Sequence, residues 1–244
     1  MKITCSKSNL VKGVSIVSKA VPSKTTMPIL ECILIDASDN QIKLTANDME
    51  LGIETKVEGS ILSKGKIALD AKLLSEIIRK LSGGESDITI ESDDKYNTTI
   101  TCDNSVFHIQ GKNGDEFSYL PFIEKDHFIC LSQFTLKEVI RQTLFSISVN
   151  DSNKMMAGEL LEVKDDFLKV VSLDGHRISI RNIQLKEHYD NHKVIVPGKT
   201  LSEISKILTG DNEKEVLIYF SKNHILFEFD DTVVVSRLID GEYF

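Results

Sequence analysis

Residues 72–83 read KLLSEIIRKLSG, and residues 199–210 read KTLSEISKILTG. The second stretch begins 127 positions after the first (199 − 72 = 127) and keeps its leading lysine, its Leu-Ser-Glu-Ile core and its closing glycine. The apolar residues of both copies recur at helical spacing on one face; they are Leu74, Ile77, Leu81 and Leu201, Ile204, Leu208. This pattern predicts helices over 71–81 and 198–208, each ended by a glycine. A repeat of this kind indicates an internal duplication.

Each repeated helix also carries two cations on the face opposite the apolar one. They are Lys72 and Arg79 in the first copy and Lys199 and Lys206 in the second. Because seven residues make almost two helical turns, the two cations of a pair are about 10 Å apart. Two further helices are predicted over 7–20 and 133–145, with the outward cations Lys12, Lys19, Lys137 and Arg141. Such basic faces suit phosphate groups, although Lys and Arg also favour helices for intrinsic reasons.

The overall composition describes a soluble globular protein with room for two domains. The chain has 244 residues, of which 41% are hydrophobic and 27% are charged. Its N-terminus, MKITCSK, lacks the apolar run of a signal peptide, so we expect the cytoplasm. The net charge of −8 is unevenly distributed, because the four predicted helices hold ten Lys/Arg and only three Glu. A polyanion would therefore be attracted by the helices and repelled by the rest of the surface.

The four cysteines are far apart in the sequence and form no C-x-x-C pair. They are Cys5, Cys32, Cys102 and Cys130, and each lies in or beside an apolar run. We therefore expect reduced, mostly buried thiols rather than a disulfide framework or a zinc site.

The duplication extends through the whole chain. At a shift of 126, Ser6 falls on Ser132 and Asp48 falls on Asp174. Each copy reads β-α-β-β-β-β-α-β-β-β, which has too few helices for a doubly wound fold. We therefore predict the α+β class, with tandem duplicated domains that each pack two helices on one side of antiparallel sheet. The predicted domains are residues 1–122 and 123–244, joined by a linker within 111–126.

The second copy is predicted to contain short strands over 158–163, 167–172, 177–183 and 194–196. The polar segment 186–193 between the last two is expected to be a solvated loop, whose two histidines would bind a stray metal at most weakly. We predict no dedicated metal site and no cofactor, since the glycine patterns of phosphate-binding loops are absent from the sequence.

Five short motifs resemble the bacterial DNA polymerase III beta subunit, the sliding clamp family. They are MPIL at 27–30, TANDME at 45–50, LDGHRI at 173–178, VIVPGK at 194–199 and LIDG at 238–241. The resemblance implies a non-catalytic processivity factor of the DNA-directed DNA polymerase holoenzyme, which encircles duplex DNA. Family clamps have three such domains per subunit and close head to tail as a homodimer ring. This chain has two domains, so we expect a two-domain portion that does not close a ring without the third.

The resemblance assigns sequence-independent DNA contacts to the helices and to two loops. The helix cations Lys12, Lys19, Lys72, Arg79, Lys137, Arg141, Lys199 and Lys206 would face phosphates without reading bases. The DNA-contacting loop positions of the family fall on Lys24, Lys72, Asn150, Lys154 and Met155. Contacts of this kind are sensitive to salt, which suits a ring that must slide.

The resemblance also implies two surfaces for protein partners. An apolar cleft would receive short linear motifs of the replicative polymerase, the clamp loader and repair proteins; it maps onto Met156, Leu173, Gly175, His176, Arg177, Ile178 and Phe244. Only part of this cleft is expected in two domains. One dimer face would lie around the helix at 72–81 and the strand at 105–110, with Ile77 and Phe107.

Two rival readings remain open at this point. An α+β hydrolase using Asp174 and His176 predicts turnover and a deep polar pocket at Gly175. A peptide-binding adaptor without a nucleic-acid role would treat the basic helices as a solvated face. Catalysis has little support, because the close histidine pair, His188 and His192, lies in the segment that is expected to be a solvated loop.

Overall fold

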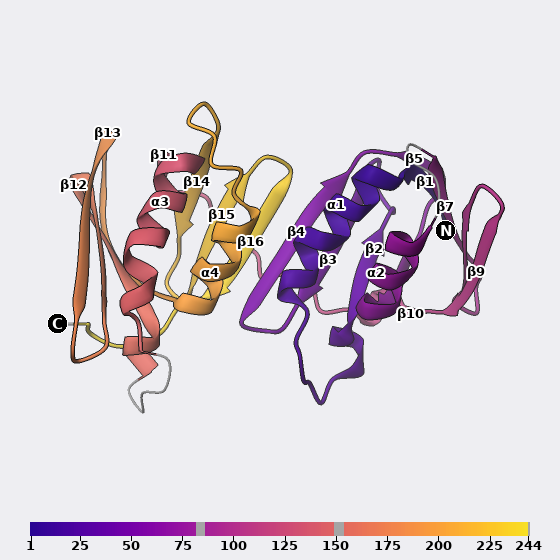
Figure 1. Cartoon of the computed structure of the whole chain (residues 1–244), viewed down its shortest axis with the longest axis horizontal. Helices are drawn as coiled ribbons and strands as arrows, with labels where there is room; N and C mark the ends of the chain where they lie inside the picture. The colour runs from indigo at the N-terminus through magenta and orange to yellow at the C-terminus, as the bar shows by residue number, and fades with distance from the viewer. Residues whose placement is uncertain (82–85, 149–153, 244) are drawn as a thin grey trace. The chain divides into compact units, whose positions relative to one another are not determined.

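The computed structural model of the chain describes residues 1–81, 86–148 and 154–243 (Figure 1). The chain divides into two compact units, unit 1 (Met1–Leu120) and unit 2 (Pro121–Phe244). The division falls two residues before the boundary that we expected between residues 122 and 123. No helix in the described ranges has the length and apolarity needed to cross a bilayer.

Unit 1 combines two antiparallel sheets with two helices, α1 (Lys7–Val17) and α2 (Ala71–Lys80). One sheet has the order β5-β1-β7-β8-β9, and the other contains the run β10-β6-β2-β3-β4. The strands are β1 (Lys2–Ser6), β2 (Cys32–Asp36), β3 (Ile42–Asn47), β4 (Leu51–Val57), β5 (Ser60–Ser63), β6 (Lys66–Asp70), β7 (Asp87–Ser92), β8 (Asn97–Cys102), β9 (Ser105–Gln110) and β10 (Lys112–Asn113). Short 3-10 helices are η1 (Ser18–Ala20), η2 (Pro28–Glu31) and η3 (Gly114–Glu116). Helices α1 and α2 pack side by side (Figure 1).

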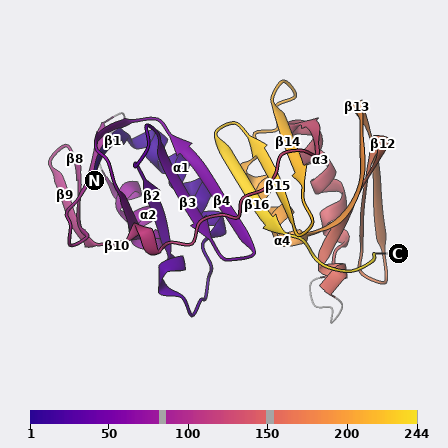
Figure 2. The ribbon, with the colours of Figure 1, turned by 180° about the vertical axis from the view of Figure 1, so that it is seen from behind.

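Unit 2 repeats this plan with helices α3 (Gln133–Thr143) and α4 (Gly198–Ile207), which also pack together. Its sheets are the run β16-β15-β14-β11 and the pair β12-β13 (Figure 2). The strands are β11 (Phe128–Ser132), β12 (Gly158–Leu173), β13 (Ile178–Pro197), β14 (Glu215–Phe220), β15 (His224–Phe229) and β16 (Thr232–Arg237). The 3-10 helices are η4 (Leu144–Ser146) and η5 (Lys154–Ala157). The fold is thus α+β, as predicted.

Local geometry follows the repeat in detail. The Ser6 and Ser132 hydroxyls cap α1 and α3 by accepting from the third residue beyond, at 3.2 and 3.0 Å. Left-handed backbone recurs at the same turns, with φ 74° at Met49 and 82° at Gly175. Asp103 and Asp230, 127 residues apart, both have φ 49°. The duplication therefore governs caps and turns as well as helix positions.

The predicted loop at 186–193 is wrong, because these residues belong to β13. The two strands expected at 158–163 and 167–172 are likewise one continuous strand, β12. Pairing runs from Gly158 opposite Pro197 to Leu173 opposite Ile178, with register shifts between Val163 and Phe167. Since much of β13 is exposed on both faces, its sequence lacks the apolar alternation that marks a half-buried strand. Within 186–193, Tyr189, His192 and Lys193 pair with β12.

Apolar side chains of the helices form the core of each unit. Leu74, Ile77 and Leu81 are at most 6% exposed, and Leu201, Ile204 and Leu208 at most 2%. All four cysteines are free; three are buried and Cys130 is partly buried. Burial raises the pKa of Cys5 to about 12 and that of Cys130 to about 11. These thiols therefore stay protonated and unreactive.

Glu159 is an ionisable residue within the core of unit 2. Its side chain is fully buried, and both carboxylate oxygens lack a hydrogen-bond partner in the described part of the chain. The neighbouring Thr143 hydroxyl donates to the Val139 carbonyl oxygen at 2.8 Å instead. Burial consequently raises the pKa of Glu159 to about 8. The folded unit holds this side chain in its protonated form.

We predict that Glu159→Gln removes a pH-dependent loss of stability. Between its ordinary pKa of 4.5 and about 8, Glu159 ionises in the unfolded chain but stays protonated in the folded one. The folded state is therefore progressively disfavoured as pH rises through this window. Glu159→Gln should raise the free energy of unfolding by up to roughly 4 kcal/mol at pH above 8 and by little at pH 5. Urea denaturation across pH measures this difference. The control Glu162→Gln, on the same strand but partly exposed, should show no such trend; parallel curves for Glu159→Gln and the unaltered chain would refute the prediction.

Candidate functional site

The clearest hollow on a helix pair lies between α1 and α2 of unit 1. A groove of about 440 Å³ runs between them, with Lys19 and Arg79 among its lining residues. Its other polar residues are Ser15, Ser18 and Ser75. The structure thus brings together two of the predicted phosphate-facing cations, one from each helix region. Hydroxyl donors beside two cations form a surface that suits phosphate oxygens.

The helix cations of unit 1 lie outside ion pairs in the described part of the chain. Lys12, Lys72 and Arg79 are exposed, and Lys19 is half-buried. Within the described ranges, no ion pair joins any of these four side chains to a carboxylate. Their field therefore extends outward from the helices without local neutralisation.

The helix cations of unit 2 are largely engaged. Arg141 binds Glu138 through two bonds, Nε to Oε1 at 3.0 Å and Nη2 to Oε2 at 2.7 Å. Lys206 Nζ lies 2.8 Å from Glu203 Oε1, and Lys199 is exposed. The hydrogen bonds from Arg141 lower the pKa of Glu138, so this carboxylate stays charged beside the arginine. The two units therefore differ in charge balance although their sequences align.

Lys137 is used inside the fold. Its ammonium group is part-buried and donates to the Leu208 carbonyl oxygen, which follows α4, at 2.8 Å. Gln133 assists the same helix end, because its Oε1 accepts from the Thr209 N–H at 3.1 Å. In unit 1 the Lys7 ammonium donates to the Leu81 carbonyl oxygen in the same way. These helix caps were not predicted from the sequence. The one relevant pattern was that Lys7 and Gln133, which cap equivalent helix ends, occupy equivalent positions of the two copies, 126 residues apart.

The predicted loop positions for DNA are only partly described. Lys24 and Lys154 are exposed, while Asn150 lies outside the described residues. Met155 packs against the cluster that includes Val171 and Tyr243. A Cβ added to Gly241 would come within 2.3 Å of the Met155 sulfur, so this contact is close. Met155 therefore contributes to the packing of unit 2, and Lys154 is the more accessible of the two.

Asp174 organises a tight turn rather than a catalytic dyad. Its Oδ1 accepts from the backbone N–H groups of His176 and Arg177, both at 3.1 Å, and its Oδ2 accepts from Arg177 Nε at 2.8 Å. These bonds, led by the one from His176, lower the pKa of Asp174. The His176 side chain is exposed, and a Cβ built at Gly175 meets nothing within 4 Å. The described residues thus provide no deep pocket at Gly175.

An exposed apolar patch adjoins this turn. Ile178 is 55% exposed and Ile180 49%, and their i, i+2 spacing places both on one face of β13. Phe145 is 59% exposed, and the Arg177 guanidinium lies 5.7 Å from its ring centroid. A hydrogen bond of 2.6 Å between the Ser146 and Ser179 hydroxyls holds η4 against the start of β13. Ile180 and Phe145 were missed from the sequence, although the two-residue period indicated Ile180.

Near this patch lies a pocket of about 300 Å³ lined by Ile239, Gly241 and Tyr243. Leu173 and Ile239 pack around the buried cluster of Leu160 and Val171. Tyr243 anchors the chain end by donating its hydroxyl to the Gly158 carbonyl oxygen at 3.1 Å. Of the other predicted cleft residues, Met156 is partly buried and Phe244 lies outside the described residues.

The two residues predicted for a dimer face have different environments. Ile77 is only 6% exposed and belongs to the core of unit 1, so its assignment to a surface is corrected. It points inward because it shares the apolar stripe of α2 with Leu74. Phe107 is half-buried on β9, which is the edge strand of its sheet, and the adjacent Val106 is 53% exposed.

Two tandem α+β units, each with paired helices on antiparallel sheet and repeated caps, define a DNA-clamp architecture. Residues 1–121 match the family described as DNA polymerase III beta subunit, N-terminal domain, and residues 130–244 match its central domain. The chain belongs to the DNA polymerase III beta subunit family. The hydrolase reading gains no support from these comparisons.

Similar proteins agree over almost the whole chain. A beta sliding clamp from Halalkalibacterium halodurans is 37% identical over 244 residues, which cover 96% of this chain and 63% of that protein. A crystal structure of a DNA polymerase III beta subunit from Eubacterium rectale has a TM-score of 0.97 at 64% identity and covers 100% of this chain and 66% of that one. A Bacillus subtilis sliding clamp has a TM-score of 0.95 at 35% identity, with the same coverage. The chain therefore spans less than two thirds of these relatives' length.

We predict that Lys137 stabilises unit 2 and that Arg141 does not. Removing the Lys137 ammonium leaves the Leu208 carbonyl without its charged donor, so Lys137→Met should lower the free energy of unfolding by about 1–2 kcal/mol. Arg141→Met is the matched control, because the exposed pair with Glu138 should leave stability unchanged within error. Urea denaturation of both variants provides the measurement. Equal stability of the two variants would contradict this division of roles.

Proposed function

We propose that this chain is part of a sliding clamp, a non-catalytic processivity factor for the replicative DNA polymerase in the cytoplasm. The observation that supports this most directly is the helix pair of unit 1, where Lys19 and Arg79, which have no carboxylate partner among the described residues, line a groove on an acidic chain. Its two clamp domains correspond to residues 1–122 and 123–244. The proteins that match it are named as clamps, which agrees with this assignment.

DNA would be held through phosphates alone. Lys19 and Arg79 lie on either side of the groove and would bind neighbouring phosphate oxygens, while Lys12, Lys24 and Lys72 extend the positive surface. Cations on long, exposed side chains bind the backbone without selecting bases. The ion pairs of Arg141 and Lys206 would weaken the attraction of unit 2 for phosphate groups, so no single phosphate would be held tightly there. Contact of this kind permits movement along the duplex.

Peptide partners would dock on the apolar patch of unit 2. Ile178 and Ile180 offer exposed apolar surface on one face of β13, and Phe145 of η4 is exposed beside Arg177. The rigid turn at Asp174 fixes the start of β13 and hence the direction of Ile178. A short linear motif with two adjacent large apolar residues suits this surface, because apolar anchors in small pockets dominate peptide binding. Motifs of polymerase, clamp-loader and repair proteins are the proposed ligands.

One subunit contact of a homodimer ring would use β9. This strand is the edge of its sheet, so one row of its backbone N–H and C=O groups is unpaired within unit 1. Val106 and Phe107 add apolar surface at the same edge. We propose that another clamp domain extends the sheet at this edge.

Charge reversal in the groove should weaken DNA binding in a salt-dependent manner. We predict that Lys19→Glu/Arg79→Glu lowers affinity for a duplex of arbitrary sequence and reduces the slope of log K against log salt by about 1–2, since two phosphate contacts are lost. Fluorescence anisotropy between low and moderate salt measures both quantities. The control is Lys95→Glu, an exposed lysine in the turn between β7 and β8. If affinity is independent of salt, or if the double variant equals the control, the adaptor reading replaces the clamp.

Binding of a clamp-type peptide should depend on Ile178. We predict that Ile178→Asp abolishes binding of a Q-x-x-L-F-type peptide, because a carboxylate replaces the exposed apolar anchor. Chemical-shift perturbation in the 244-residue chain detects even weak binding. Leu62→Asp, at an equally exposed apolar position in unit 1, is the control and should bind normally. Unaltered binding by Ile178→Asp would show that the peptide site lies elsewhere.

A further inference from the structure

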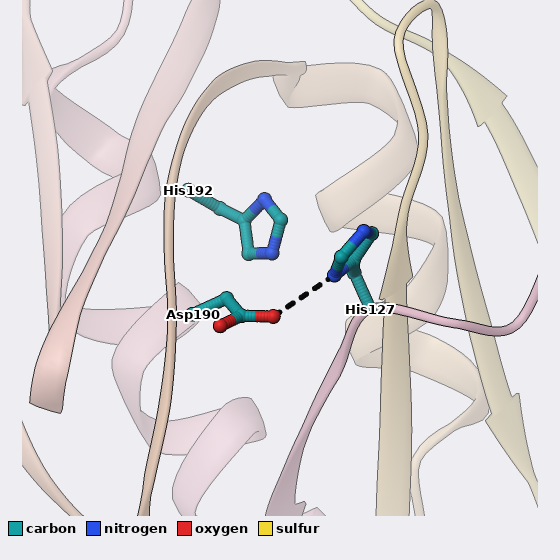
Figure 3. Close-up of side chains that lie close together, drawn as sticks. All are labelled: His127, Asp190 and His192. Atoms are coloured by element: carbon teal, nitrogen blue, oxygen red, sulfur yellow. Dashed lines mark hydrogen bonds and ion pairs between the residues drawn. The ribbon is translucent and has the colours of Figure 1, made fainter.

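Three potential metal ligands converge in unit 2 (Figure 3). His127 immediately precedes β11, while Asp190 and His192 are two residues apart on β13 and thus share a face. His127 Nδ1 is 3.0 Å from Asp190 Oδ2, and one ligand atom of each residue lies within 4.8 Å of the other two. His127 is held in place because its carbonyl oxygen accepts from the Phe220 N–H at 3.0 Å.

His192 is the fixed member of this group. Its ring stacks on Phe220, with centroids 4.7 Å apart and an interplanar angle of 8°. Its Nε2 is buried and has no hydrogen-bond partner in the described part of the chain. A nitrogen of this ring faces Asp190 and His127 (Figure 3). A buried polar atom without a partner is uncommon in native proteins, and a bound ion or water would supply the missing partner.

The spacing suits a small divalent ion. At zinc–ligand distances of about 2.0–2.1 Å, two ligands of a tetrahedral site are roughly 3.3 Å apart. The observed 3.0 Å between His127 and Asp190 is close to this value, and 4.8 Å is the upper limit for the other pairs. His127 and Asp190 are exposed, whereas the His192 ring is stacked on Phe220. Two imidazoles and one carboxylate are preferred ligands of zinc-type ions, and water can complete the shell.

We propose that His127, Asp190 and His192 bind a divalent transition-metal ion of the zinc type. The ion would replace the proton shared between His127 and Asp190 and would satisfy the buried Nε2 of His192. It would also tie the segment before β11 to the middle of β13. The proposal does not depend on DNA or peptide binding.

The duplicated fold argues that these ligands are not a structural requirement. A shift of 126 places His127 on Met1, and a shift of 127 places Asp190 on Ser63 and His192 on Gly65. These positions are also neighbours in unit 1, where a Cβ added to Gly65 would lie 3.0 Å from the Met1 Cβ. In unit 1 a methionine and a glycine therefore occupy the positions of His127 and His192, and neither side chain there is an imidazole.

Calorimetric titration of the tag-free, reduced chain with Zn²⁺ and with Co²⁺ tests the proposal. We expect saturable binding of one ion per chain and a rise of several degrees in the thermal unfolding of unit 2. Asp190→Asn and His192→Gln should each weaken binding at least about tenfold, because even outer partners of metal ligands are worth 10- to 100-fold. His188→Gln is the matched control, since His188 is an exposed histidine on the same strand and should bind normally. The Co²⁺ spectrum should lack thiolate bands.

A second readout does not depend on variants, which is useful because His192→Gln removes a stacked ring. Zn²⁺ should shift the imidazole ¹⁵N resonances of His127 and His192 in the unaltered chain and leave those of His188 and His176 in place. Absence of saturable binding, or loss of binding in His188→Gln equal to that in Asp190→Asn, would overturn the proposal. The three residues would then form an ordinary exposed ion pair beside a stacked ring.

Discussion

The burial of one apolar stripe per helix against antiparallel sheet determines where the charges of this protein lie. Leu74 and Ile77 in α2, and Leu201 and Ile204 in α4, are almost completely removed from water. Each such side chain contributes roughly 1.5–3 kcal/mol through burial, which no surface ion pair matches. Once these apolar faces are buried, the residues on the opposite helix face must point to solvent. Lys72 and Arg79 of α2 are therefore exposed as a consequence of core packing.

The two copies keep this packing but differ in electrostatics. Lys12, Lys72 and Arg79 of unit 1 have no carboxylate partner in the described ranges, whereas Arg141 and Lys206 are paired three residues away on their own helices. Paired charges cancel at a distance, while unpaired ones add. Most of the attraction for a polyanion would consequently come from unit 1. Unit 2, by contrast, carries exposed apolar side chains at Ile178 and Ile180, so in the proposed clamp the copies would divide phosphate and peptide contacts between them.

Sequence periodicity predicted what depends on burial and failed where burial is absent. The four helices follow from apolar spacing, and serine is a residue type that favours the cap positions that Ser6 and Ser132 occupy. Segment 186–193 was misassigned because a strand exposed on both faces has no alternation to detect. Ile77 was placed on a surface although its own helical stripe marks it as core.

For the candidate site, too, local features could be predicted from the sequence and long-range contacts could not. Its exposed members could be listed from motifs, since LDGHRI fixes the positions of the turn and of Ile178 along the chain. The engagement of Lys137 with Leu208 could not, because a contact across 71 residues depends on how α3 and α4 pack. The convergence of His127 with β13 is equally remote in sequence. Contacts that join distant segments need the tertiary register, which no local pattern contains.

The backbones of the two copies also differ in one stretch. In unit 1 the residues after β4 form the separate strand β5, which pairs with β1. In unit 2 the equivalent residues, 186–189 at a shift of 126, stay within β13, and the register slips between Val163 and Phe167. A strand exposed on both faces gains little from burial, so it needs other contacts to hold its register. The stacking of His192 on Phe220 and the bond from Asp190 to His127 supply such contacts, and both link β13 to the β11–β14 sheet. A metal ion at this point would strengthen a link that the fold of unit 2 already contains.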